Sequence, residues 1–228
     1  MITRKKLIRK SHRYLGLFLG IQFLFWTVSG LYFSWTNIDE IHGDHFKKQD
    51  IQNEYHKNLI HLDSLKIKEG ISQIELRNID KKPFYWINNK YLINAYNAKL
   101  KNGVNKEEAI KIAQKHLSKN LVIESIELLT ETDKHNEYRS KQLPAYKIAY
   151  IHKDRITVYI SKDDGKFQKL RHRSWRWFDF LWMTHTMDYD TRDNFNTTIL
   201  RVFSLLGLIT VLSGFLLWIS SSKRLKKN

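Results

Sequence analysis

Two long apolar runs without any charged residue frame the sequence, one near each end. The first covers residues 15–35 and the second covers residues 202–219, or 199–219 if the apolar positions before Arg201 join it. A helix rises about 1.5 Å per residue, so the first run would extend about 31 Å, the thickness of a bilayer's hydrocarbon core. We therefore predict transmembrane helices at 15–35 and 199–219.

Each run also has a second explanation. The first resembles the apolar part of a cleaved signal peptide, because basic residues precede it. However, it is longer than such a segment, and no Ala-x-Ala site follows it. The second run could be the buried core helix of a soluble protein, but its length and its basic flank argue against this. Uncleaved membrane anchors explain both runs.

Residues 36–198, between the runs, show the short alternating pattern of antiparallel strands, interrupted by one helical pattern. In the first half of this segment, a strand is predicted at 71–77, and residues 83–96 are predicted to form two strands joined by a turn at 88–89. In the second half, strands are predicted at 123–129, 143–151 and 155–161. Asn105 with Glu108 three residues later has the form of a capping box and predicts the start of a helix. A turn is predicted at 163–166.

The two groups of strands resemble each other, which indicates an internal duplication of a small α+β unit. Ser-Gln-Ile-Glu-Leu from residue 72 is similar to Ser-Ile-Glu-Leu from residue 125, and Lys-Pro-Phe-Tyr from residue 82 is similar to Leu-Pro-Ala-Tyr from residue 143. We place the copies at about 58–103 and 105–170. Chance similarity between short strands is the alternative.

The predicted fold class is an α+β membrane protein. Two transmembrane helices flank an extracytoplasmic tandem domain at 36–198, in which each copy is a helix plus an antiparallel meander. After the second copy, the aromatic segment 171–187 is predicted to be an amphipathic helix at the membrane interface, with Arg171, Arg173 and Arg176 directed toward lipid phosphates.

Charge supports the membrane assignment. The chain has 39 Lys and Arg against 23 Asp and Glu, a net charge of +16 that first suggests nucleic acid. Ten of the cations lie in the two tails, 1–14 and 220–228, which contain no acid. Such tails are typical of the cytoplasmic side of spanning helices, where they meet anionic lipid, so no nucleic-acid partner is expected. The absence of cysteine excludes disulfides and thiolate metal sites.

Several short motifs occur in an order that is more specific than any one of them. They are an Ala-containing helix at 108–113, Leu-Pro-Ala-Tyr at 143–146, Thr-Val-Tyr-Ile at 157–160 before an Asp-Gly-Lys turn, His-Arg-Tyr-Leu-Gly-Leu at 12–17, Ser-Gly-Leu at 29–31 and Ser-Gly-Phe-Leu-Leu-Trp at 213–218. In this order they resemble the PepSY domain and the PepSY-associated transmembrane proteins.

The resemblance implies an inner-membrane protein tied to iron uptake or siderophore reduction, a family in which some members bind haem. The larger members have four or more spanning helices. With two, this chain would supply only part of a transmembrane electron path.

The histidines at the predicted membrane edges are the candidate ligands. His12 begins the first helix beside small residues that leave room for a macrocycle. His185 follows an aromatic segment outside the second helix, and His42 and His45 lie outside the first. His12 and His185 are expected about 30 Å apart on opposite sides of the membrane, so one haem cannot use both.

Two kinds of cofactor fit these positions. For haem b, His185 would pair with His42 or His45, and His12 would need a ligand from another chain. For a transition metal, nitrogen and carboxylate donors suit iron, copper or zinc. The candidate metal ligands are His42, His45, His185, Asp39, Asp44 and Asp188. A polar cap after the first helix is the alternative explanation of the segment 39–45.

These observations predict an accessory of iron, haem or siderophore handling in the bacterial inner membrane, with both termini cytoplasmic and the central domain periplasmic. The expected partners are the lipid bilayer, other membrane subunits or a second copy, and a peptide or siderophore. We expect no enzyme in the chain by itself; as a component, it would serve a haem-dependent ferric or siderophore reductase. The alternative is a non-enzymatic PepSY module that binds a peptide, a protease or a partner subunit.

Overall fold

The computed structural model describes residues 4–51 and 54–221 and divides the chain into two compact units. Residues up to 36 and from 177 onward form the first, here called the helical unit. Residues 37–176 form the second, here called the sheet unit. The predicted basic tail at 220–228 lies almost entirely outside the described residues.

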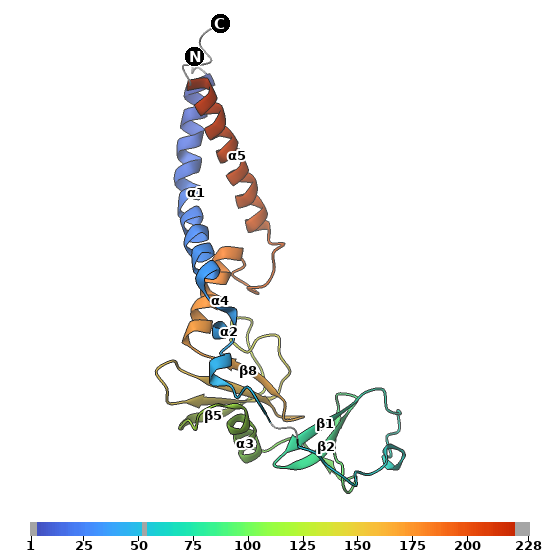
Figure 1. Ribbon diagram of the computed structural model, residues 1–228. Coiled ribbons are helices and arrows are strands. Elements are labelled where there is room, and N and C mark those ends of the chain that lie inside the picture. Colours follow the sequence, from blue (N-terminus) through green and yellow to red (C-terminus); the bar gives the residue numbers. More distant parts are fainter. Residues whose placement is uncertain (1–3, 52–53, 222–228) are drawn as a thin grey trace. The chain divides into compact units, whose positions relative to one another are not determined.

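Two long helices build the helical unit. Helix α1 spans Arg4–Trp35 and α5 spans Thr198–Ser221, and they lie side by side with opposite directions (Figure 1). Both are long and apolar enough to cross a membrane. The predicted spans 15–35 and 199–219 fall inside them. Helix α1 begins earlier than its apolar run, because the preceding Lys and Arg residues are themselves good helix formers.

Small and aromatic residues bring the two helices together. The rings of Phe18 and Phe203 stack with centroids 5.5 Å apart. A Cβ added to Gly207 would lie 3.2 Å from the ring of Phe23, so this glycine lets the ring reach the backbone of α5. Such close approach through small residues is typical of helix pairs that lack a hydrophobic driving force in lipid.

The predicted aromatic segment 171–187 is mostly helix α4, which spans Arg173–Thr186. The expectation that Arg171 and Arg176 face lipid phosphates is wrong. Arg171 belongs to the preceding strand and donates through Nε to the Glu137 carbonyl oxygen, at 3.0 Å. Arg176 binds the Glu137 carboxylate with two nitrogens, at 2.6 and 2.9 Å. A planar guanidinium fits such a carboxylate with two parallel hydrogen bonds, and the sheet unit supplies it.

The first sheet of the sheet unit is a four-stranded antiparallel meander. Its strands are β1 Ile74–Ile79, β2 Lys82–Ile87, β3 Tyr91–Asn94 and β4 Leu100–Lys101. Asn88 and Asn89 have φ angles of 52° and 55°, as a tight hairpin turn requires, which confirms the turn predicted there. The helix expected in the copy at 58–103 is absent. Besides the four strands, these residues contain one short helical element, the 3-10 turn Leu62–Ser64.

The second sheet has the same order and carries a helix. Helix α3 spans Lys106–His116 and precedes β5 Ile123–Leu129, β6 Ala145–Tyr150, β7 Thr157–Ser161 and β8 Phe167–Arg171. The predicted capping box is confirmed: Asn105 accepts from the backbone of Glu108, and the Glu108 carboxylate accepts from the backbone of Asn105. Contacts with β6, β7 and β8 place α3 against one face of the sheet.

One hydrophobic core joins the two sheets. Ile79, Phe84 and Trp86 from the first sheet share a buried cluster with α3 and the second sheet. Beside it, Arg77 of β1 donates two hydrogen bonds to Asp164, which is only 2% exposed, at 3.0 and 3.1 Å. The sheet unit is therefore α+β with two antiparallel four-stranded sheets.

Candidate functional site

His12 lies where the start of α1 meets the end of α5. Its Nδ1 is 2.8 Å from Ser213 Oγ and 3.2 Å from the Thr210 carbonyl oxygen, and the Ser213 hydroxyl donates to that same carbonyl. A carbonyl oxygen only accepts, so Nδ1 carries the proton and Nε2 keeps its lone pair. Gly214 makes room for the ring, since a Cβ there would lie 3.2 Å from His12 Cε1.

His185 makes the same kind of contact further along α1. Its Nδ1 is 2.7 Å from Ser29 Oγ, and the Ser29 hydroxyl donates to the Phe25 carbonyl oxygen at 2.6 Å. Because that hydroxyl proton is used within the helix, Ser29 accepts the Nδ1 proton of His185. The Nε2 of His185 is therefore also left with its lone pair.

A histidine that donates Nδ1–H to a fixed acceptor has the tautomer and ring orientation of a metal-binding imidazole. His12 and His185 both satisfy this condition, and both are only half-buried. Ser29 follows His12 by 17 residues on α1, which is about 26 Å of helix. Because His185 contacts Ser29, His12 and His185 lie at two separate positions along α1. One haem ring therefore cannot use both histidines.

Aromatic rings surround His185 within the helical unit. Phe33 lies edge-on to its ring with centroids 5.5 Å apart, and Phe33 also contacts Phe178 and Trp182. Trp26 Nε1 donates to the His185 carbonyl oxygen at 2.7 Å and fixes the end of α4 on α1. Burial lowers the pKa of His185 from its usual value, which favours the neutral imidazole at neutral pH.

Asp188, predicted as a metal ligand, instead organises the loop before α5. Its carboxylate accepts from the backbone N–H groups of Asp190, Thr191 and Asn194 and from the Thr191 hydroxyl. Burial alone would raise its pKa, but these hydrogen bonds lower the pKa to about 2. Its oxygens are thus already used by this loop.

Two further contacts stabilise this loop. Arg192 pairs with Asp179 of α4. Thr197 caps α5, because its hydroxyl accepts from the Leu200 N–H at 3.2 Å.

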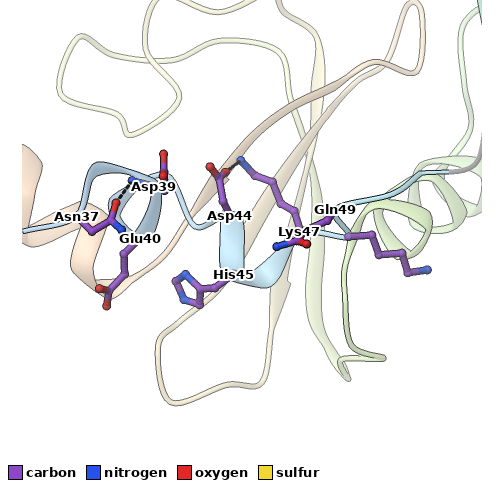
Figure 2. Close-up of a pocket in the computed structure, with 8 residues that line it drawn as sticks. Asn37, Asp39, Glu40, Asp44, His45, Lys47 and Gln49 are labelled. Atoms are coloured by element: carbon purple, nitrogen blue, oxygen red, sulfur yellow. Dashed lines mark hydrogen bonds and ion pairs between the residues drawn. The ribbon is translucent and has the colours of Figure 1, made fainter.

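The other candidate ligands lie in the sheet unit, on a short helix α2 Ile38–Ile41 and a 3-10 turn Asp44–Phe46. Asp39, Asp44 and His45 line an open cleft of about 720 Å³, whereas His42 lines a neighbouring cleft beside β8. Figure 2 draws the first cleft and shows Asp44 directed at Lys47, 2.6 Å away, whereas the ring of His45 points away from both. Across residues 4–51 and 54–221, no three His, Asp or Glu side chains are placed to hold one metal ion.

The six candidates are thus divided between the units. His42, His45, Asp39 and Asp44 belong to the sheet unit, whereas His185 and Asp188 belong to the helical unit. The predicted meeting of His185 with His42 or His45 stays a prediction.

His172, which is not among the candidate ligands, holds the start of the sheet unit in place. It is 1% exposed, and its Nε2 donates to the Ile41 carbonyl oxygen at 3.1 Å. Burial lowers its pKa. It packs beside His45 and Phe46, with ring centroids 5.6 and 5.3 Å away. Its Nε2 is occupied, which separates it from His12 and His185.

In comparisons with known proteins, no family model, no curated protein and no solved structure matches the chain.

Proposed function

We propose that the chain is a PepSY-type integral protein of the bacterial inner membrane that serves as an accessory in iron, haem or siderophore handling. In this proposal α1 and α5 cross the bilayer, both termini are cytoplasmic, and the sheet unit is a periplasmic tandem PepSY-like domain. The observation that carries it is the pair of histidines that each donate Nδ1–H to a serine of a neighbouring helix and keep Nε2 unprotonated.

The side chains present suit haem b. His12 and His185 each offer one neutral imidazole nitrogen, the usual axial ligand, at different depths of the helix pair. Ser213 and Ser29 hold the rings, Gly214 leaves space beside one, and Phe33 excludes water beside the other. Haem would supply one-electron chemistry at these positions. Since the two histidines are about 26 Å apart, one haem cannot use both. In this proposal His42 or His45 would be the second ligand beside His185, and another chain would supply the second ligand beside His12.

Long apolar surfaces support the membrane placement. Leu17, Phe18, Leu205 and Leu216 are more than half exposed within the helical unit. Exposing many apolar side chains along two helices is unfavourable in water, whereas the same surface is favourable in the hydrocarbon core of a bilayer.

The haem content of the purified full chain tests this proposal. Cells supplied with iron and haem are used, and haem per chain is measured in wild type, His12→Ala, His185→Ala and the control Ser34→Ala. Ser34 lies on α1 but bonds only within the helix, to the Leu31 carbonyl oxygen. We expect each histidine variant to lose at least half of the haem and Ser34→Ala to lose none. Equal haem in all four proteins would contradict the proposal.

One observation favours the alternative of a peptide-binding module. Strand β5 is a seven-residue edge of the second sheet, so its outer backbone groups pair with no other strand of residues 4–51 and 54–221. Extended peptides bind such edges by adding a strand. A peptide or subunit that copurifies in mild detergent, and that is lost when a proline replaces Ile126 in β5, would support this alternative.

A further inference from the structure

A second cleft of the sheet unit, of about 370 Å³, runs beside β8, the edge strand of the second sheet. The segment 46–48 forms its other side, held to the end of α3 by hydrogen bonds from Lys48 N–H to the His116 carbonyl and from Ser118 N–H to the Phe46 carbonyl. Apolar side chains form part of its lining. The lining residues are His42, Asp44, Lys47, Lys48, Ile51, His116, Phe167, Gln168, Lys169, Leu170 and Arg171.

The lining contains four cations and a single acid. That acid, Asp44, is already bound by Lys47. Within the part of the chain that the structure describes, Lys48 and Lys169 form no ion pair. The cleft therefore carries uncompensated positive charge.

Lys169 shows this imbalance most clearly. It is half-buried on β8, and its pKa is lowered first by burial and then by repulsion from Lys141, Arg171 and Lys47. A lysine in this setting gains from a nearby negative charge, because the charge offsets both the lost hydration and the repulsion.

Arg171 and His116 also line the cleft but have other contacts. Arg171 lies with its guanidinium 3.6 Å from the centre of the Trp175 ring and bonds to the Glu137 carbonyl, so it adds to the field without being aimed at a ligand. His116 donates Nδ1–H to the Ile112 carbonyl and stacks on Phe167. Its neutral ring therefore has no proton on Nε2 to offer. Lys47, Lys48 and Lys169 are the charged donors directed to the cleft, beside the polar side chains of His42 and Gln168.

We propose that this cleft binds a small soluble oxyanion with two or more negative charges, such as a phosphate or a polycarboxylate. The three lysines would supply charge-assisted hydrogen bonds to its oxygens, and the apolar walls would strengthen them by excluding water. This site lies in the sheet unit and requires no haem in the helical unit, so either proposal can fail without the other.

Calorimetric titration of the full chain with inorganic phosphate and with citrate tests the site. The protein is held in nanodiscs of zwitterionic lipid at low salt, as wild type, Lys169→Gln and the control Lys99→Gln. Lys99 is an exposed lysine of the loop before β4 and makes no ion pair among the described residues. We expect saturable binding of at least one anion per chain, weakened at least tenfold in Lys169→Gln and unchanged within twofold in Lys99→Gln.

Thermal unfolding separates a binding defect from a folding defect. Without anion, Lys169→Gln should melt no lower than wild type, because the change removes repulsion. With anion, only wild type and Lys99→Gln should melt higher. The proposal is overturned if neither anion binds, if both variants are weakened equally, or if a response requires nanodiscs that contain anionic lipid.

Discussion

At the scale of single residues, the hydrogen-bond partner of each histidine decides what the ring can do. His12 and His185 give Nδ1–H to serines whose own protons are used within their helices, so Nε2 stays available. His172 gives Nε2–H to the Ile41 carbonyl from a buried position and thereby fixes a chain segment. The same residue type is thus a candidate ligand in two places and a structural bond in a third.

The sequence indicated His12 and His185 through their position at the ends of apolar runs. Their serine partners lie 201 and 156 residues away along the chain, so no local pattern could reveal them. The sequence also placed Asp188 among the metal ligands, because a carboxylate in a polar loop looks the same whether it binds a metal or the backbone. Only the geometry of the loop distinguishes the two.

Asp188 provides a test of the loop that leads into α5. Replacing Asp188 with Ala should lower the free energy of unfolding by about 1–2 kcal/mol, the usual cost of a lost cap, because three backbone N–H groups lose their acceptor. Asp193→Ala, an exposed change in the same loop, should have little effect. Thermal melting of both variants in the same detergent measures the difference, and equal melting temperatures would contradict the assigned role.

The same residue predicts an acid dependence. Its pKa in the folded chain is about 2, below the ordinary value of 3.8. A depressed carboxyl pKa contributes stability that is present above the unfolded value and is lost as the pH falls toward the folded value. The difference in melting temperature between wild type and Asp188→Asn should therefore be constant above about pH 5 and shrink between pH 4 and pH 2. A difference that stays constant down to pH 2 would show that the carboxylate is not held in this way.

At the scale of elements, ion pairs connect the first sheet with the second part of the sheet unit, and two of them lie in contrasting environments. Arg77 and Asp164 are 17% and 2% exposed, whereas Lys111 and Asp80 are 55% and 45% exposed. Water screens the exposed pair, and it restrains long side chains for little gain. Removing Asp164 from the shielded pair leaves the charge of Arg77 compensated only by Glu75, which is 37% exposed.

This contrast gives a second stability prediction. Asp164→Ala should destabilise the sheet unit by about 3 kcal/mol, since Arg77 would lose its buried carboxylate partner and keep only the more exposed Glu75. Asp80→Ala should produce no measurable change. Denaturant unfolding of the full chain, followed by tryptophan fluorescence, compares them. A loss of similar size in both variants would mean that burial does not govern the two pairs.

Most strands were predictable because their buried positions alternate or form short apolar runs. Strand β8 was not, since Phe167, Gln168 and Lys169 do not alternate, and a bulge opposite Tyr159 and Ile160 shifts its register. Strand β4 has only two residues, too few for any pattern. The basic cleft was not predictable either. Lys169 and Arg171 are far from Lys47 and Lys48 in sequence, and only strand β8 brings them together.

At the scale of the whole molecule, charge and hydropathy indicate one topology. The cations of the N-terminal tail lie in the first turns of α1, before its apolar run, and every acidic residue lies between the two apolar helices. In the proposed arrangement the basic ends stay in the cytoplasm and the sheet unit is translocated.

The absence of cysteine makes this topology directly testable. Lys10→Cys and Lys99→Cys would each carry the only thiol of the chain. In spheroplasts, a membrane-impermeant maleimide should label the thiol at position 99 at once. The thiol at position 10 should react only after the membrane is permeabilised. The reverse pattern, or immediate labelling at both positions, would contradict a periplasmic sheet unit.

The most direct test of the proposed function is the absorption spectrum of the purified full chain, oxidised and then reduced with dithionite. Protein from cells supplied with iron and haem should show a Soret band that shifts on reduction, as expected for iron held by histidine. The His185→Ala variant should show a weaker band. A folded wild-type protein without such a band would contradict haem binding at His12 and His185.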